Sequence, residues 1–321
     1  MPRPRIVALV ALALLPACGA EPAPVTRPPE RPAGTLVYVT DGNRLTAVDV
    51  ASGRRRARRV SAVATCGPEM FVTAGHVVFA GLRGSRTTVF SIPVALDRPP
   101  VRLGPAHQFV PSATPGRVWL AGVDCDRRRM VGVREVAVDG RVTAASSSRV
   151  PGSWVAAAVR GGLVLQRGRA LVLWDPRTGR TVRRLRLAAV SDTRGDVMVG
   201  CTPRSRCRDV AIVDAASART IVAPRRLESD AVLSPDGSHL AAHVLRKRRW
   251  SVVLVDTRSG TVTAVPGART GRTYSQLAWA STGWLFIGGR RGRILAYRPG
   301  APRAVRLPLR LPADAPVFAA G

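Results

Sequence analysis

Lysine is almost absent from this chain of 321 residues, since Lys247 is the only lysine among 50 basic residues. Acidic residues are also few, and the 20 present leave a formal net charge of +30. So strong a preference for arginine indicates a GC-rich genome, such as an actinobacterial one, so part of the charge reflects base composition rather than function. The charge still produces a field that attracts anions and anionic polymers.

Long apolar runs are missing near the start of the chain. The apolar segment Ile6–Leu15 follows Arg3 and Arg5 and is too short to cross a bilayer as a helix. A positive start followed by a short apolar segment is typical of an export signal. We therefore expect an exported protein, for which nucleic acid is not the natural partner.

The next residues, Leu15-Pro16-Ala17-Cys18, resemble the lipobox of bacterial lipoproteins. The resemblance implies that residues 1–17 are a signal peptide and that Cys18 is diacylated, anchoring the protein to the outer face of the cytoplasmic membrane. The alternative is an ordinary signal cut near Ala20, which would leave a secreted soluble protein. Residues 18–34 are rich in proline and charge, and we expect an extended tether there.

Four further cysteines, an even number, suggest disulfides in an exported chain. Cys201 and Cys207 flank a turn-rich segment between two apolar runs, so a hairpin would bring them together. Cys66 and Cys125 then pair by elimination. A metal site is disfavoured because no histidine is close in sequence to the C-x5-C spacing.

Common catalytic motifs are absent: the sequence has no G-x-S-x-G, S-x-x-K or glycine-rich phosphate loop in a suitable context. His239 and His243 are four residues apart, a separation of about 13 Å on a strand, which is too far for one metal ion. We interpret both as ordinary strand histidines. No catalytic residue, metal or cofactor is predicted.

Turn residues are plentiful, with 30 glycines and 26 prolines between short apolar runs, which favours an all-β protein. One segment, Ala231–Gly267, reads as four short strands joined by three turns. Its third strand ends at an aspartate followed by a turn, and the same event recurs along residues 35–321 at spacings of 36 to 48 residues. The markers are Asp49, Asp97, Asp139, Asp175, Asp214 and Asp256, with Tyr297-Arg298 in the seventh place.

Seven units of about 41 residues predict a seven-bladed β-propeller of four-stranded blades over residues 35–321. The middle strands carry consecutive apolar residues, such as V-V-L-V before Asp256, as expected for sheets buried on both faces. The first unit lacks one strand, and the apolar run near Phe318 is left over. We expect this C-terminal strand to pair into the N-terminal blade and close the ring. In the fifth unit, the sequence predicts only a weakly patterned inner strand, Ala189–Ser191.

Two segments resemble known repeat families. L-V-Y-V-T-D-G-N-R-L-T-A-V-D-V-A-S-G, beginning at Leu36, is similar to the YVTN-type propeller repeat of secreted bacterial proteins, and Ala231–Ala242, with its S-P-D-G turn, resembles TolB-type repeats. Trp174-Asp175 ends a strand as in WD repeats, without the Gly-His partner of that motif. The resemblance implies a fold, and propellers host many unrelated activities.

Arginines gather between the second and third strands of every unit, and in a propeller these links share one face. Because guanidinium groups suit phosphates and carboxylates, they predict a ring of positive charge for an anionic polymer, lipid headgroup or acidic protein. The residues are Arg44, Arg83, Arg86, Arg127, Arg128, Arg129, Arg167, Arg169, Arg204, Arg206, Arg208, Arg246, Lys247, Arg248, Arg249, Arg290, Arg291 and Arg293. The competing interpretation is a solvated, arginine-biased surface, since the links Arg54–Arg59 and Arg177–Arg184 are basic too.

These observations favour a monomeric, non-catalytic binding or scaffold lipoprotein of the cell envelope. The alternative is a propeller enzyme, such as a lactonase-like hydrolase or a quinone-dependent dehydrogenase. That class needs a metal or cofactor at the central channel, with acidic or Asn/His ligands on the inner strands. The inner strands predicted here are mostly apolar and small, which disfavours it.

Overall fold

The structure is a computed structural model of the chain. It describes residues 32, 34, 36–40, 44–60, 70–83, 86–124, 129–145, 150–202, 209–222, 227–228, 230–246, 249–271, 276–288, 292–310 and 318–320. Residues 31–321 form one compact unit. Within the described ranges, no helix is long and apolar enough to cross a membrane.

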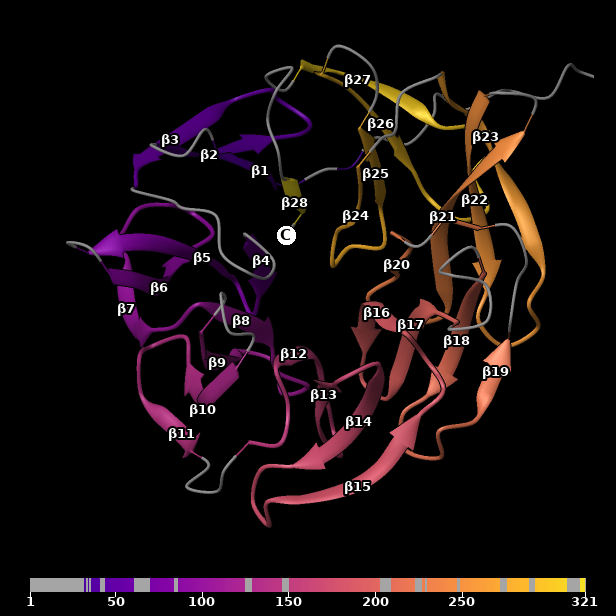
Figure 1. The fold of residues 1–321 in the computed structure, drawn as a ribbon. Helices are drawn as coiled ribbons and strands as arrows, with labels where there is room; N and C mark the ends of the chain where they lie inside the picture. The colour runs from indigo at the N-terminus through magenta and orange to yellow at the C-terminus, as the bar shows by residue number, and fades with distance from the viewer. Residues whose placement is uncertain are drawn as a thin grey trace, which may run out of the picture. The chain divides into compact units, whose positions relative to one another are not determined.

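Strands dominate the described residues and form seven four-stranded antiparallel sheets, called blades one to seven (Figure 1). Blade one contains β28 (Phe318–Ala320), β1 (Leu36–Thr40), β2 (Arg44–Asp49) and β3 (Arg55–Arg59); blade two contains β4 (Met70–Thr73), β5 (His76–Arg83), β6 (Arg86–Pro93) and β7 (Val101–Pro105). Blade three contains β8 (Gln108–Pro111), β9 (Arg117–Asp124), β10 (Arg129–Ala137) and β11 (Val142–Ala145); blade four contains β12 (Trp154–Val159), β13 (Gly162–Arg167), β14 (Ala170–Asp175) and β15 (Arg180–Leu185). Blade five contains β16 (Ala189–Arg194), β17 (Val197–Cys201), β18 (Val210–Asp214) and β19 (Thr220–Val222); blade six contains β20 (Val232–Leu233), β21 (His239–Arg246), β22 (Arg249–Asp256) and β23 (Val262–Gly271). Blade seven contains β24 (Leu277–Trp279), β25 (Leu285–Gly288), β26 (Arg293–Tyr297) and β27 (Val305–Arg310).

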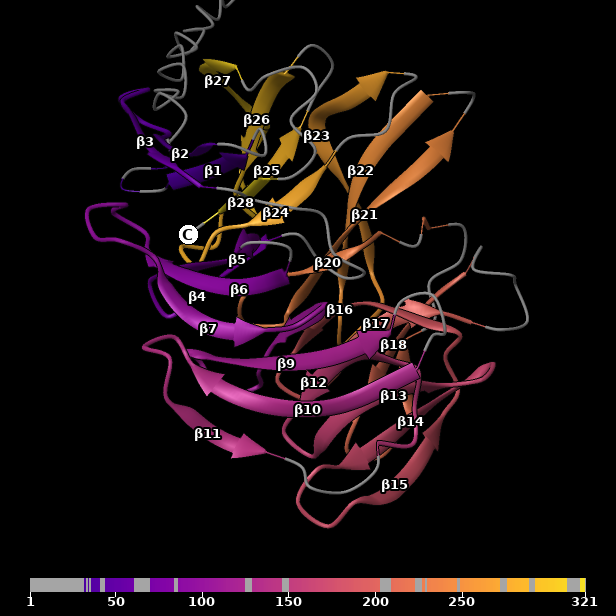
Figure 2. The ribbon, with the colours of Figure 1, turned by 60° about the vertical axis from the view of Figure 1, so that its left-hand side comes forward.

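The innermost strands of neighbouring blades touch one another around the centre. Contacts join β8 to β12, β12 to β16, β16 to β20, β20 to β24, β24 to β28 and β28 to β4. The remaining neighbours, β4 and β8, are linked by Phe71 and Phe109, whose ring centroids are 5.6 Å apart. The sheets therefore follow one another around a closed ring, stacked face to face as Figure 2 shows. This is the architecture of a β-propeller.

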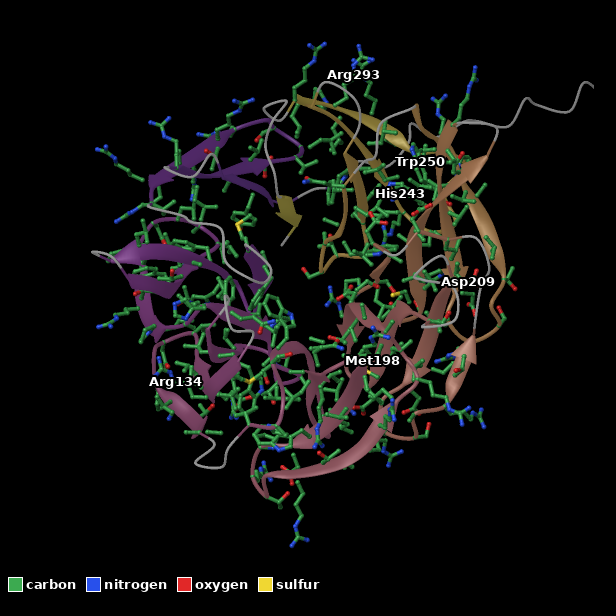
Figure 3. All side chains as sticks on the ribbon, in the orientation of Figure 1. Arg134, Met198, Asp209, His243, Trp250 and Arg293 are labelled. Atoms are coloured by element: carbon green, nitrogen blue, oxygen red, sulfur yellow. The ribbon has the colours of Figure 1, made fainter. Side chains whose placement is uncertain are left out.

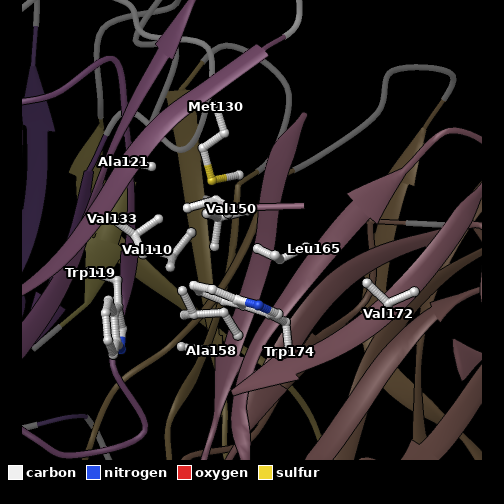
Figure 4. Close-up of a cluster of buried hydrophobic side chains, with 12 residues drawn as sticks. Val110, Trp119, Ala121, Met130, Val133, Val150, Ala158, Leu165, Val172 and Trp174 are labelled. Carbon is white, nitrogen blue, oxygen red and sulfur yellow. The ribbon is translucent and has the colours of Figure 1, made fainter. Parts of the chain in front are cut away.

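The apolar core is divided among the interfaces between blades. Each cluster of buried side chains takes residues from two neighbouring sheets, as Trp119 of blade three and Trp174 of blade four do in Figure 4. Another cluster joins Val48 and Val50 to Phe286 and Ile294, which unites blade seven with blade one. Every blade thus buries both faces, which explains why its middle strands tolerate consecutive apolar residues. β14, β18 and β22 each bury a run of four residues, as predicted from the sequence.

The C-terminal strand closes the ring. β28 pairs with β1 in antiparallel register, with Val37 opposite Ala320 and Val39 opposite Phe318. The expected pairing of the chain's end with its first blade is confirmed. It supplies the inner strand that the N-terminal repeat lacks.

Five of the six aspartates that mark the repeats accept a backbone N–H of the turn that follows, namely Asp49, Asp139, Asp175, Asp214 and Asp256. Oδ1 of Asp49 accepts the backbone N–H of Ser52 at 2.7 Å, and Oδ1 of Asp256 accepts that of Ser259 at the same distance. The Ser52 hydroxyl is the main cause that holds the pKa of Asp49 below its usual range, and backbone N–H groups of Arg177 and Ser259 are the main causes that lower the pKa values of Asp175 and Asp256. In the S-P-D-G turn, the Ser234 hydroxyl is the main cause that lowers the pKa of Asp236 to about 2.

The inner strand of blade five differs from the sequence prediction. It runs from Ala189 to Arg194, beyond the predicted end at Ser191, and it includes polar residues. The largely buried carboxylate of Asp192 explains the extension. Its Oδ2 accepts the N–H of Leu233 in blade six at 2.8 Å. A polar side chain therefore connects the inner strands of blades five and six.

Polar links of this kind connect inner strands elsewhere in the ring. Oε1 of the buried Gln108 accepts the N–H of Val155 at 2.9 Å, and its Nε2 donates to the Val155 carbonyl. Nε1 of Trp279 donates to the carbonyl of Val232 at 3.1 Å. In each case a side chain on one inner strand satisfies the backbone of a neighbouring inner strand, which fixes the blades in register as well as in contact.

We expect Gln108→Met to lower the free energy of unfolding by roughly 2 to 4 kcal/mol, because both hydrogen bonds to Val155 are lost in a buried place. Chemical denaturation measures the change. The matched control is Gln166→Met, since the Gln166 amide makes a local, exposed hydrogen bond to Gly168, and it should cost less than about 1 kcal/mol. Equal losses for the two variants would contradict the proposed link between blades.

Candidate partner-binding face

The connectivity of the blades places all links between second and third strands on one side of the ring. In an antiparallel sheet, the link between the second and third strands lies at the same end as the exit from the fourth. The passage to the next blade is short, for example Ala106 and His107 between β7 and β8, so it stays on that side. We call the side formed by the links β1–β2, β5–β6, β9–β10, β13–β14, β17–β18, β21–β22 and β25–β26 the hairpin face.

Part of the predicted basic ring falls on described residues. Exposed arginines border the hairpin face in blades one, four, six and seven, namely Arg44, Arg167, Arg169, Arg249 and Arg293. Figure 3 shows Arg293 near the outer edge of blade seven. Outside the described residues are Arg127, Arg128, Arg204, Arg206, Arg208, Lys247, Arg248, Arg290 and Arg291, and the side chains of Arg83, Arg86, Arg129 and Arg246 are also undescribed. Their role in binding stays a prediction.

The exposed arginines of this face contrast with arginines that serve the fold. Arg117 donates to Glu135 at 3.1 Å, and Arg194 donates to Asp192 at the same distance. Within the described ranges, Arg249 and Arg293 have no carboxylate within ion-pair distance.

Positive charge is not confined to the hairpin face. Strand β3 has the sequence R-R-A-R-R and is mostly exposed at the outer edge of blade one. On the opposite face, the links between third and fourth strands carry the exposed residues Arg98, Arg141, Arg177 and Arg258. Charge alone therefore does not single out the hairpin face, and any test of it needs charge-matched controls from the other face.

A buried histidine lies behind the hairpin of blade six. His243 is fully buried, and its Nδ1 is 3.3 Å from Oδ2 of Asp230. The ring of Trp250 meets the imidazole edge-on, with centroids 6.2 Å apart. Figure 3 labels both residues in blade six. The two strand histidines have different surroundings, because Nδ1 of His239 contacts the Ser238 hydroxyl instead. Sequence reasoning missed the pair, although an acidic residue just before an inner strand was visible.

The buried carboxylates of the described residues have structural partners. Oε1 of Glu135 accepts from the Ser112 hydroxyl at 2.6 Å, and Oε2 accepts from Thr143 at 2.8 Å as well as from Arg117. Burial raises the pKa of Asp192, against the opposing effects of Arg194 and of two backbone N–H donors. Both carboxylates already bind groups of the propeller itself, so neither offers an open coordination site.

One cysteine, Cys201, lies among the described residues. Cys201 is buried at the end of β17 and takes part in a disulfide bond. Cys18, Cys66, Cys125 and Cys207 lie outside the described residues, so the predicted pairings Cys201–Cys207 and Cys66–Cys125 stay predictions.

No family model and no curated protein matches the chain. Solved structures do match. The computationally designed protein Ika8 is 13% identical over 85% of this chain and 83% of its own, with a TM-score of 0.55. The WD40 domain of Toxoplasma gondii coronin is 13% identical over 87% and 77%, with a TM-score of 0.52. Apo AztD from Citrobacter koseri is 11% identical over 91% and 97%, with a TM-score of 0.50. Identities this low show the fold alone, and the fold is the propeller class that the repeat resemblances implied.

We expect the purified protein to contain no stoichiometric Ca²⁺ or Zn²⁺. Among the described residues, no group of three or more His, Cys, Asp or Glu side chains is arranged to hold a metal ion. Elemental analysis of protein purified without chelator is the measurement. One equivalent of either metal would instead support the propeller-enzyme alternative, which needs a metal or a cofactor at the channel.

Proposed function

We propose that this protein is a non-catalytic binding protein of the cell envelope, which presents the hairpin face of its propeller to an anionic partner. The observation that carries the proposal is the set of exposed arginines that the blade connectivity places on one face, of which Arg249 and Arg293 have no carboxylate within ion-pair distance among the described residues. A rigid ring supports these groups at fixed positions, so their charge can act together on one extended anion. The partner is either an acidic protein or an anionic envelope component.

The proposed location rests on the first 34 residues. A lipid on Cys18 and a proline-rich tether would hold the propeller close to the membrane while leaving it free to turn either face toward a partner. Concentrating a basic surface in this way strengthens weak contacts to neighbouring anions without any new interaction.

Lipid attachment is tested by growing cells with a labelled fatty acid. We expect the full-length protein to incorporate the label and Cys18→Ser to lose it, because the thiol of Cys18 is the acylation site that the lipobox resemblance implies. A protein that carries no label and begins near Ala20 would instead be a secreted soluble protein.

Neutralising the hairpin of blade six tests the binding face. The variant Arg246→Gln, Lys247→Gln, Arg248→Gln and Arg249→Gln should bind anionic vesicles or a soluble polyanion at least about tenfold more weakly at low salt, since each basic residue near an anionic surface contributes about 1 kcal/mol. The salt dependence of binding should also become shallower.

The control removes the same charge from the opposite face, as Arg98→Gln, Arg141→Gln, Arg177→Gln and Arg258→Gln. It should bind nearly as well as the wild type. Equal weakening in both variants would show that net charge alone matters, and unchanged binding and salt dependence in the blade-six variant would exclude that hairpin from the partner site.

A further inference from the structure

Two hairpins on opposite sides of the ring share one design. In blade two, β5 and β6 are joined by a two-residue link, and Arg83 lies directly opposite Arg86. In blade six, β21 and β22 are joined by a link of the same length, and Arg246 lies directly opposite Arg249. Figure 1 places β5–β6 on one side of the ring and β21–β22 on the other.

Like charges directly opposite each other weaken a strand pair. Nothing about the fold requires arginine at both closing positions, because hairpins of this length close well with small or turn-forming residues. The backbones of two directly paired residues are roughly 5 Å apart, so each pair brings two positive charges to one hairpin end, and a phosphate is the kind of group that two arginines bind together.

An exposed leucine precedes the closing arginine in both hairpins. Leu82 is 48% exposed and lies opposite Thr87, while Leu245 is 51% exposed and lies opposite Trp250. The second strands of blades two and six therefore end in the same order, with an exposed leucine followed by the arginine that closes the strand pair.

A third apolar residue reaches the same face from blade three. The register of β9 and β10 shifts between Met130 and Gly132. At this irregularity Val131 has no paired residue on β9. Val131 is 77% exposed. Irregularities of this kind re-aim side chains and are common beside functional sites.

We propose that these three tips dock the hairpin face onto an anionic phospholipid surface. The arginines bind lipid phosphates, while Leu82, Val131 and Leu245 enter the boundary between headgroups and acyl chains. A soluble polyanion would engage the arginines but has no apolar layer for the aliphatic residues. The tips of the neighbouring blades two and three contact the membrane on one side of the ring and the tip of blade six contacts it on the other, which sets the orientation of the ring. This inference rests on the proposed function and names the partner of the same face.

The experiment uses the full chain carrying Cys18→Ser, so that no attached lipid contributes. Sedimentation with vesicles of phosphatidylglycerol and phosphatidylcholine measures membrane binding, vesicles of phosphatidylcholine alone report any contribution of residues 1–34, and heparin serves as the soluble polyanion. We expect the triple variant Leu82→Ser, Val131→Ser and Leu245→Ser to bind the anionic vesicles at least about tenfold more weakly and heparin as well as before.

Two further variants make the result specific. Arg83→Gln, Arg86→Gln, Arg246→Gln and Arg249→Gln should weaken binding to both anionic vesicles and heparin. The apolar control Val101→Ser, Val182→Ser and Val262→Ser removes exposed valines of the outer strands and should change neither. Circular dichroism and thermal unfolding verify that each variant is folded.

The outcomes separate the two proposals. If the leucine and valine variant binds anionic vesicles like the wild type, or neutral vesicles bind as well as anionic ones, the membrane-docking inference is wrong. If heparin binding then still depends on the arginines, the anionic-partner function survives. If the arginine variant keeps both activities, the proposed function fails as well.

Discussion

The pairing of β28 with β1 is the constraint on which the rest of the structure depends. Each blade is stable only because both of its faces are covered by neighbours, and in an open row the two end blades would each leave one face in water. A short antiparallel pairing with Val37–Val39 turns the row into a ring. The cluster that joins Val48 to Phe286 then completes the set of interfaces between blades.

A ring held in this way has consequences for the candidate site. The links that leave one end of every blade must lie on one face, whatever their sequence, so the residues they carry act as a group. The propeller explains why arginines separated by more than one repeat, such as Arg167 and Arg249, can belong to one surface. It also gives two polar residues of the inner strands, Gln108 and Asp192, a structural role, since each binds the backbone of a neighbouring blade.

Much of this arrangement could be predicted from local patterns. The buried runs of β14, β18 and β22 could be predicted because sheets covered on both faces need consecutive apolar residues. The aspartate turns could be predicted because the hydrogen-bond partners of each aspartate lie two or three residues away. The burial of Gln108, Asp192 and His243 could not be predicted in this way. A polar residue suggests exposure in a sequence, and the groups that make burial of Gln108 and Asp192 acceptable, Val155 and Leu233, lie more than 40 residues away. The exposed Leu82, Val131 and Leu245 were missed for the converse reason, because aliphatic residues in a strand suggest a core.

The closure by β28 also bears on the order of events in folding. Most contacts between blades join residues about one repeat apart, so each new blade can dock on the one before it with little delay. The last contact joins segments about 280 residues apart in sequence, which adds about 2 kcal/mol of loop entropy relative to a single repeat. Because β28 follows every other strand in the chain, β1 keeps an unpaired edge during synthesis until the last residues have been made. The first blade is therefore the part of the molecule most open to pairing with another chain during folding.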